Sequence, residues 1–551
     1  MNTSYKVGAN RWKEVGIARC YSFLITLLLA VAFTNVAYAQ QVITVTGQVT
    51  DENNEPLPGT TVAIEGTDQG TIADLDGGYS IDVAEEGVLV FSFVGFETQS
   101  ISVDGRETID VVMVEAQSFL DELVVVGYGV QEKATMTGSV GTIAANEIEN
   151  RTVSSAEELL QGQVAGLNVI RNSGQPGNQS INLQIRGTST FSGNPVLVLV
   201  DGVPTSLDRV NPNDIESISV LKDAASASIY GSRASGGVIL VTTKTGQKGE
   251  PQFSFRSTVS RQSPTRFPTK VSALDHMLAQ NEMRENDGGP PKYSQEEIDE
   301  ASSPGFKEWD WDDFMYDDAL QTNQNFSVSG GTDRHDYYAS IGYLYQDGIF
   351  LNSDYQRFNV QLNQNLRLGD RLKIGLNAAY SPAVRTAPAS VNFGLIAQTS
   401  SLIGIRTDDG KWLTHPERTG GGRNPLYAAS EDGGQELNKS SRITGNLKVD
   451  YDILPNLMLT GSYGLVQNSA RNRNYTALLT FYDQYNPDQV ASTTDYNTLD
   501  IDYRSSIQQN TNLLLNYTNN FRNHSLDVLA GVTAEWYLVC LLYTSPSPRD
   551  S

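Results

Sequence analysis

Hydrophobic and polar residues alternate with a period of two through much of the chain between residues 251 and 538. One stretch places Leu372, Ile374, Leu376, Ala378 and Tyr380 on one side, and Arg371, Lys373, Gly375 and Asn377 on the other. The alternation recurs in residues 337–345, 358–362, 443–451, 457–465, 513–517 and 526–536. Successive side chains of a β-strand point to opposite faces, so the pattern predicts strands with one apolar and one polar face. Tyrosines near the ends of such segments are typical of outer-membrane strands, although a soluble β-sandwich also alternates.

The connections between these segments differ in length. Short turns, such as Gly369-Asp370 and Leu454-Pro455-Asn456, alternate with long insertions near residues 265–319 and 382–439. This asymmetry is typical of periplasmic turns and extracellular loops. The pattern predicts about nine strands, whereas a plugged transporter has ~22. Because an open sheet would leave edge amides unpaired in lipid, we expect residues 251–538 to be the first part of a barrel that continues further.

Residues 134–246 predict a mixed α/β domain. A helix is expected to start near Ser154, which is followed by Glu157 and Glu158. Residues 196–200 form a continuous apolar run, as expected of a strand that is buried on both faces, and a turn follows it. Residues 214–221 alternate and lead into a short helix of small residues at 222–227, before a last strand at 238–243.

Residues 42–115 contain short alternating runs that are separated by turn clusters, and they predict a small β-sandwich. Asp74 and Asp76 beside Gly77 suggest either a calcium loop or a tight hairpin turn. The turn is favoured, because the loop lacks the other oxygen ligands and the closing Glu of an EF-hand.

The first 39 residues predict a cleaved secretory signal. Arg11, Lys13 and Arg19 precede an apolar run at 23–33, and Ala37-Tyr38-Ala39 precedes Gln40. The alternative is a membrane anchor, but the run is shorter than the ~20 residues that span a bilayer. Export to the periplasm, the outer membrane or the exterior is therefore expected.

Composition narrows the functions further. The net charge of −25 argues against nucleic acid as a partner. The histidines are His276, His335, His415 and His524, without the spacing of a zinc protease. No nucleophile, acid/base pair, metal site or cofactor loop emerges, so we expect neither an enzyme nor a cofactor. The acidic run from Asp310 to Asp318 could bind cations or sugars, although a solvated loop is the simpler interpretation.

The last residues, 540–551, break the alternation with CLLYTSPSPRD. A back-translation of this segment resembles the transposase adapter used for sequencing libraries. We therefore expect residues 540–551 to be an artefact of sequencing. Cys540 would then be lost with the tail and Cys20 with the signal, which leaves no cysteine for a disulfide or a thiolate metal site.

Four segments carry a resemblance to a known family. The sandwich resembles the carboxypeptidase-regulatory-like domain over VTGQVTDENNEPLPGTTVAIEGTDQGTIADLDGGYSIDV. Residues 118–133, SFLDELVVVGYGVQEK, resemble the TonB-box region of SusC-like proteins. Two stretches, residues 185–204 and 211–246, resemble the plug signatures of the SusC/RagA family. They read IRGTSTFSGNPVLVLVDGVP and NPNDIESISVLKDAASASIYGSRASGGVILVTTKTG.

This resemblance implies a TonB-dependent importer in the outer membrane, with the sandwich in the periplasm. Its partners would be a TonB-type energy-coupling protein, a SusD-like surface lipoprotein and membrane lipid, and its substrate an oligosaccharide (glycan) or a peptide. A siderophore-type TonB-dependent receptor is the nearest alternative. A surface adhesin or binding protein is a further alternative, but it would lack both plug and coupling segment.

The resemblance also assigns candidate residues. The coupling residues are Asp121, Glu122, Leu123, Val124, Val125 and Val126, and a linker strand internal to the fold is the alternative. The plug signature comprises Arg186, Gly187, Asp201, Gly202, Lys222, Asp223, Tyr230, Gly231, Arg233 and Gly237. Arg186 and Arg233 are expected to pair with acids of the barrel wall rather than with substrate.

The mature protein is expected to begin at Gln40, because Ala37-Tyr38-Ala39 satisfies the small-residue rule for signal cleavage. Amino-terminal sequencing of the protein from outer-membrane preparations checks this. An intact Met1 start would contradict it.

Overall fold

The computed structural model describes residues 42–544, with gaps. The gaps are 52–53, 65–66, 68, 94–95, 97, 115–122, 127–128, 133–138, 150, 152, 188–195, 267–269, 390–399, 415–423, 425–426, 494–496 and 522–523. Two compact units divide the chain: residues up to 122 together with 132–134, and residues 123–131 together with 135–551. The predicted fold class is confirmed, because both units are built mainly of strands.

The first unit is the predicted β-sandwich. One sheet has the order β4 (Gly78–Ala84), β1 (Val42–Thr50), β7 (Val111–Val112). The other has the order β3 (Gly70–Ile72), β2 (Thr61–Ile64), β5 (Val88–Ser92), β6 (Gln99–Ser102). Every second residue of β4 is buried, and a core that includes Val45, Leu89 and Phe91 lies between the sheets.

Asp74 makes the tight turn that the sequence favours over a calcium loop. Its Oδ1 accepts hydrogen bonds from the backbone N–H of Asp76 at 3.0 Å and of Gly78 at 2.8 Å. Gly77 between them has φ +77°, which suits glycine. The carboxylate oxygen is thus engaged by the turn itself.

The second unit contains a five-stranded mixed sheet, which we call the plug sheet. Its order is β10 (Val140–Ala144), β15 (Ile215–Leu221), β16 (Val238–Thr243), β13 (Leu197–Val200), β14 (Val203–Pro204). β13 and β16 run parallel, and the other neighbours are antiparallel. Three of these strands agree closely with the runs predicted at 196–200, 214–221 and 238–243.

Short helices and a hairpin complete the plug. They are α2 (Ala145–Glu149), α3 (Ala156–Leu159), η3 (Leu207–Arg209), η4 (Pro212–Asp214), α4 (Ala224–Ala227), η5 (Ser228–Gly236) and the hairpin β11 (Leu167–Arg171) with β12 (Ile181–Ile185). Ser155, one of the two serines at the predicted helix start, caps α3. Leu159, Leu160 and Leu207 pack with Ile215 and Ile218 into one apolar core.

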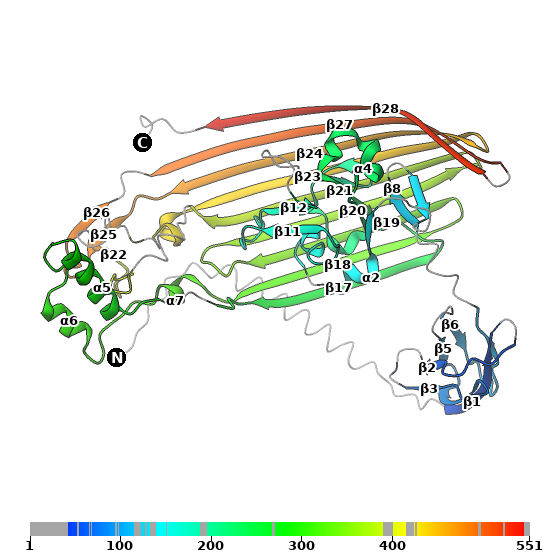
Figure 1. Cartoon of the computed structure of the whole chain (residues 1–551), viewed down its shortest axis with the longest axis horizontal. Helices are drawn as coiled ribbons and strands as arrows, with labels where there is room; N and C mark the ends of the chain where they lie inside the picture. Colours follow the sequence, from blue (N-terminus) through cyan, green and yellow to red (C-terminus); the bar gives the residue numbers. More distant parts are fainter. Residues whose placement is uncertain are drawn as a thin grey trace. The chain divides into compact units, whose positions relative to one another are not determined.

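A nine-stranded antiparallel sheet, which we call the wall, forms the largest part of the second unit (Figure 1). Its strands are β17 (Gly249–Gln262), β18 (Ala319–Gly331), β19 (His335–Asp347), β20 (Asp354–Leu368), β21 (Leu372–Pro388), β23 (Gly434–Leu454), β24 (Leu457–Thr476), β27 (Thr498–Phe521) and β28 (His524–Thr544). Each pairs with the next in this order. The alternation therefore predicted the number of strands correctly.

The two faces of the wall have inverted polarity compared with a soluble sheet. In β20, Phe358 is 50% and Val360 43% exposed, whereas Asn359 and Gln361 on the opposite face are 8% and 9% exposed. Other exposed apolar side chains of the wall include Phe253, Phe255, Ile341, Tyr380, Leu447, Tyr451, Leu513, Val528 and Trp536. Buried polar side chains include Asn325, Ser340, Arg357, Asn363, Ser381, Asn446, Asn510 and Asn512. The wall thus turns its apolar side outward and its polar side toward the plug.

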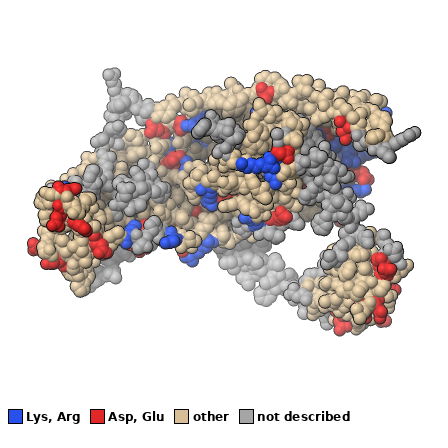
Figure 2. Space-filling view, in the orientation of Figure 1, with Lys and Arg blue, Asp and Glu red and all other residues tan. Residues whose placement is uncertain are grey.

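Insertions at one end of the wall carry their own small core. They contain α5 (Ala273–Asn286), α6 (Gln295–Ala301), α7 (Trp311–Met315), β22 (Trp412–Thr414), η6 (Tyr427–Ala429), η7 (Glu431–Gly433), β25 (Thr480–Asp483) and β26 (Val490–Thr493). Trp311 is fully buried beside Trp412 and Phe481. Acidic side chains gather over α5 and α6 (Figure 2). Among the described residues, no helix is both long and apolar enough to cross a membrane.

Some boundaries differ from those expected. β21 and β23 extend into the predicted insertion at 382–439, so that only residues 389–433 lie outside the strands. A further insertion between β24 and β27 was not predicted. β28 continues to Thr544, pairing Ser505 with Cys540, although the sequence suggested that the strand pattern breaks there. In the acidic run, Asp310 caps α7 and Asp312 pairs with Lys270 at 3.0 Å.

Gly237→Ala is expected to destabilise the protein by about 1–3 kcal/mol more than Gly162→Ala, because overpacking adds to the backbone strain. Both glycines have positive φ, +91° and +74°, and Gly237 also has ψ 173°, a combination that is essentially confined to glycine, so backbone strain adds to the cost there. A Cβ at Gly237 would lie 2.6 Å from Cδ1 of Ile185, whereas nothing lies within 4 Å of one at Gly162. Urea denaturation measures the difference, and equal costs would contradict the packing argument.

Candidate functional site

The candidate site is the interface between the plug and the polar face of the wall. The plug contributes the segment from Asp201 to Asp214, and the wall contributes inward side chains of β18–β24. Asp201 and Gly202 form the two-residue turn between β13 and β14, with φ +49° and +81°. Such turns need positive φ at both positions, which explains why Asp-Gly stands here.

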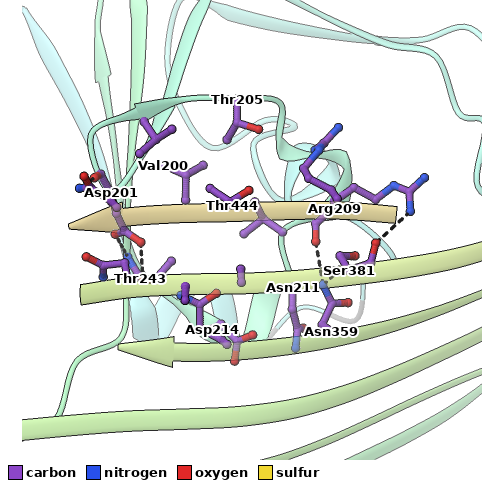
Figure 3. Close-up of a pocket in the computed structure, with 18 of the residues that line it drawn as sticks. Val200, Asp201, Thr205, Arg209, Asn211, Asp214, Thr243, Asn359, Ser381 and Thr444 are labelled. Atoms are coloured by element: carbon purple, nitrogen blue, oxygen red, sulfur yellow. Dashed lines mark hydrogen bonds between the residues drawn. The ribbon is translucent and has the colours of Figure 1, made fainter. Parts of the chain in front are cut away.

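Asp201 joins the turn to the end of the plug sheet (Figure 3). Its carboxylate accepts hydrogen bonds from Thr243 N at 2.9 Å and Thr243 Oγ1 at 2.7 Å. From the wall, Asn446 Nδ2 donates to the Asp201 carbonyl and Asn363 Nδ2 donates to Thr243 Oγ1, both at 2.7 Å. Burial raises the pKa of Asp201, although the bonds from Thr243 oppose the shift. Two wall strands thus hold this end of the plug through neutral amides.

Asp208 is the centre of the charged contacts. Arg442 of β23 donates to Asp208 Oδ1 at 2.7 Å, to Ser206 O at 3.1 Å and to Asn468 Oδ1 at 2.7 Å. Arg209 donates to Ser440 Oγ at 2.6 Å. Partial burial would raise the pKa of Asp208, but Arg442, Ser206 and Arg209 hold it at about 2. This carboxyl therefore stays ionised at neutral pH.

Asp214 lies at the third contact region. Tyr338 of β19 donates its hydroxyl to Asp214 Oδ1 at 2.8 Å, and Asn211 Nδ2 donates to Asn325 Oδ1 at 2.8 Å. Burial raises the pKa of Asp214. The wall has glycine at position 342, where a Cβ would lie 2.7 Å from Asn211 Nδ2. The side-chain amide of Asn211 can therefore approach the wall closely at this point.

The contacts leave a small cavity of about 50 Å³ between Asp201, Arg209 and Asp214 (Figure 3). Both polar and apolar side chains line it, among them Asn359, Thr444, Val203 and Val360, and its volume is sufficient for a water molecule. Each neutral hydrogen bond contributes only about 1 kcal/mol net, because water replaces it when it breaks. Each single neutral contact between the plug and the wall therefore stabilises the interface only slightly.

The plug-signature residues occupy structural positions. Arg233 forms an ion pair with Glu535 of β28, which is a wall acid, whereas Arg186 is exposed and has φ +57°. Lys222 Nζ donates to Ala165 O at 3.3 Å, and Asp223 caps α4. The bonds from Ser226 and Ser139 lower the pKa of Asp223 to about 2. Gly187, Gly202, Gly231 and Gly237 all have positive φ, and Tyr230 is buried.

The amides on the inner face of the wall were not predicted from the sequence. Asn359 Nδ2 donates to Arg209 O at 2.7 Å, in addition to the contacts of Asn363 and Asn446. The signal was present in β20, where asparagine and glutamine occupy every inward position from 359 to 365. Uncharged amides at alternate positions indicate a face that bonds backbone groups rather than solvent.

The predicted coupling residues are only partly described. Asp121 and Glu122 lie outside the described residues, as do Ala39 and Gln40 of the signal cleavage site. Leu123–Val126 form strand β8, which pairs with β9 (Gly129–Glu132) in a two-stranded sheet. Among the described residues, no group of three or more His, Cys, Asp or Glu side chains could hold a metal ion.

Two family models match parts of the chain. Residues 132–238 match the TonB-dependent receptor plug domain, and residues 45–126 match the carboxypeptidase-D-regulatory-like domain. TonB-dependent receptor SusC of Bacteroides thetaiotaomicron is 32% identical over 483 residues, which cover 81% of this chain and 46% of SusC. The chain belongs to the SusC/RagA-type TonB-dependent receptors.

Further relatives agree with this membership. TonB-dependent receptor P26 of Formosa agariphila is 35% identical over 384 residues, which cover 68% of this receptor chain and 38% of P26. The receptor chain thus spans less than half the length of these curated relatives. The structure of the RagAB peptide importer in its open-open state matches with a TM-score of 0.63 at 23% identity, covering 77% of this chain and 50% of the other. At that identity, the match supports the fold.

Arg442→Met is expected to lower the free energy of unfolding at pH 7 by about 1–2 kcal/mol, because it removes the bonds to Asp208, Ser206 and Asn468. The ionised Asp208 contributes stability above its unfolded pKa of 3.8, and this contribution is lost as pH falls through about 2. The difference from the unsubstituted protein should therefore shrink between pH 4 and pH 2. Arg473→Met, at an exposed wall arginine, is the control, and an equal effect there would refute the role of Asp208.

Proposed function

We propose that the chain is the N-terminal part of an outer-membrane transporter that imports a nutrient with energy from a TonB-type protein. The inverted polarity of the wall carries this proposal. An apolar outer face suits lipid, and a polar inner face suits a removable plug rather than a permanent core. The contacts of Asn363, Asn446 and Arg442 with the plug are hydrogen bonds and one ion pair made by side chains of the wall. Family membership supports the same function.

The segment 118–133 would be the point where the periplasmic protein pulls. An extended strand such as β8 can bind a partner through main-chain hydrogen bonds and so bear load. The chain continues from β8 through β9 and then, past residues 133–138 outside the described part, into β10. Among the described strands, β10 lies at the edge of the plug sheet and pairs with β15 alone. A pull on β8 would therefore reach an edge strand before the buried strands β16 and β13.

The remaining parts of the proposal follow from the relatives. A SusD-like surface lipoprotein would cap the transporter, and the sandwich would lie in the periplasm. The substrate would be an oligosaccharide or a peptide, as the resemblance of the sequence to the SusC/RagA family implies, and the RagAB peptide importer has the same fold. A bacterium that expresses the full-length gene is required to test transport.

Val125→Pro in the full-length gene is expected to abolish nutrient-dependent growth while the receptor is still present in the membrane. Proline removes one backbone donor of β8 and fixes φ, so a partner strand cannot pair in register. Growth on the cognate glycan or peptide is compared with receptor abundance in isolated outer membranes.

Val125→Thr is the matched control, because threonine keeps the β-branch and the backbone N–H. It should support normal growth. Normal growth of the proline variant at normal receptor levels would show that the coupling segment lies elsewhere.

A further inference from the structure

A second cavity, of about 260 Å³, lies between the plug and wall strands β19 and β20. The plug lines it with the start of α3, with the loop between β11 and β12, and with η3. The wall contributes Gln346, Tyr355 and Arg357. Tyr355 and Gln346 are paired across the two strands. The cavity is large enough for a small organic group with its water.

The arginines and one acid around this cavity are already engaged in bonds within the protein. Arg357 donates to Asn359 Oδ1 at 2.8 Å, to Asp208 O at 2.8 Å and to Ser154 O at 3.2 Å. Arg209 bonds Ser440 and lies 3.4 Å from Asp208. Asp208 in turn accepts from Arg442 and Ser206. An anionic ligand would find no uncommitted cation among these groups.

Glu157 is the charged residue at this cavity that is not engaged in this way. Its carboxylate lines the cavity and is half-buried, and no hydrogen bond or ion pair joins it to any side chain in the described part of the chain. Burial, with Asp208 and Glu158 nearby, raises the pKa of Glu157 from 4.5 to about 7, against the opposing effect of Arg442. An uncompensated carboxylate in such a place costs stability.

The Glu157 carboxylate is not needed to cap helix α3. Ser155 caps the helix by accepting from Glu158 N, and the Glu158 carboxylate bonds Ser154 N and Oγ at 2.9 Å each. Glu158 also pairs with Arg171 at 3.1 Å. The local structure therefore uses Glu158 and leaves Glu157 directed at the cavity.

A second acceptor without a partner lies in the same cavity. Gln346 is 2% exposed, and its Oε1 has no hydrogen-bond partner among the described residues. Buried acceptors are almost always satisfied in native proteins, so an orphaned one indicates a missing donor. Glu157 and Gln346 both require hydrogen-bond donors. The carboxylate of Glu157 also favours a donor with a positive charge.

We propose that this cavity is a subsite for a primary ammonium group of the imported substrate, with Glu157 as its counter-ion and Gln346 as a second acceptor. An ammonium has three donors and no acceptor, which matches the two unfilled groups. The inference rests on the proposed import function, and it narrows the substrate to a molecule that carries an amine. Peptides with lysine and oligosaccharides with amino sugars share this chemistry.

Binding to the purified full-length receptor tests the subsite directly. Two ammonium probes are titrated by ligand-observed NMR at pH 7: N-acetyl-lysyl-alanine amide and a trisaccharide of glucosamine. Each is compared with its N-acetylated form, which keeps the shape and loses the charge. Loss of a charge-assisted contact is expected to weaken binding about tenfold.

Glu157→Gln should reduce binding of the ammonium probe about tenfold and leave the acetylated probe unchanged. Glu216→Gln, at an exposed glutamate on strand β15 of the plug sheet, is the matched control and should change neither. Circular dichroism verifies that both variants fold. Preference for the lysyl peptide or for the amino sugar identifies the source of the ammonium, and either preference supports the subsite.

The pH dependence gives an independent readout. The lysyl ammonium stays charged between pH 6 and 8, while Glu157 with a pKa of about 7 loses its charge, so affinity should fall about tenfold from pH 8 to pH 6. The charged groups around it from the other elements are Asp208, Arg209, Arg357 and Arg442, with Glu158 on the same helix. The arginines stay protonated, and Asp208, with a pKa of about 2, stays ionised across this range. Glu157→Gln should remove the dependence.

Two results would overturn the inference: no preference for ammonium over acetylated probes, or equal binding to the Glu157→Gln and unsubstituted receptors. Failure of the import proposal would look different. If Val125→Pro grew normally while the ammonium preference held, the coupling segment would be wrong and the subsite would stand. If transport required Val125 but the probes showed no preference, only the subsite would be wrong.

Discussion

The position of the plug in the second unit depends on hydrogen bonds between side chains on the inner face of the wall and backbone groups of the plug. The strands of the wall expose Phe358 and Val360 on one side and bury Asn359 and Gln361 on the other. A sheet of this kind cannot be stabilised by an apolar interior. Its inner polar groups need partners, and Arg209 O, Lys244 O and Asp201 O of the plug supply them. The wall therefore constrains where the plug backbone must lie.

The contacts between the plug and the wall are mainly neutral hydrogen bonds, with few ion pairs. Most contacts are neutral amides that water can replace, whereas the ion pairs Arg442–Asp208 and Arg233–Glu535 are few and lie at separate places. A denser set of buried charges would cost more to separate, because each unpaired ion would have to be rehydrated individually. The apolar core of the plug, around Ile215 and Ile218, is by contrast shielded within the plug itself. Separation from the wall can thus leave this core intact.

Much of this architecture could be predicted from the sequence, because the periods of two and the turn residues are local signals. The strands at 196–200 and 238–243 and the turn at Asp201-Gly202 depend on neighbouring residues only. The partners of Asp208 and Thr243 could not be predicted, since Arg442 and Asn363 lie 234 and 120 positions away. The extent of β21 and β23 was also missed, because their outer ends carry polar residues that resemble a loop.

The order of strands in the wall implies an order of assembly. From β17 to β28, each strand pairs with the strand that precedes it in this sheet, so the wall can grow by adding hairpins as the chain becomes available. The plug sheet lacks this property, because β13 pairs in parallel with β16, and two strands (β14 and β15) and four short helices (η3, η4, α4 and η5) intervene in the sequence. Pairings between distant segments form slowly, since a long loop must close first. The bond from Asn446 to Asp201 joins residues 245 positions apart and closes only after β23 has joined the wall. The plug can therefore form its native hydrogen bonds with the wall only late in biogenesis, after β23 has joined the wall.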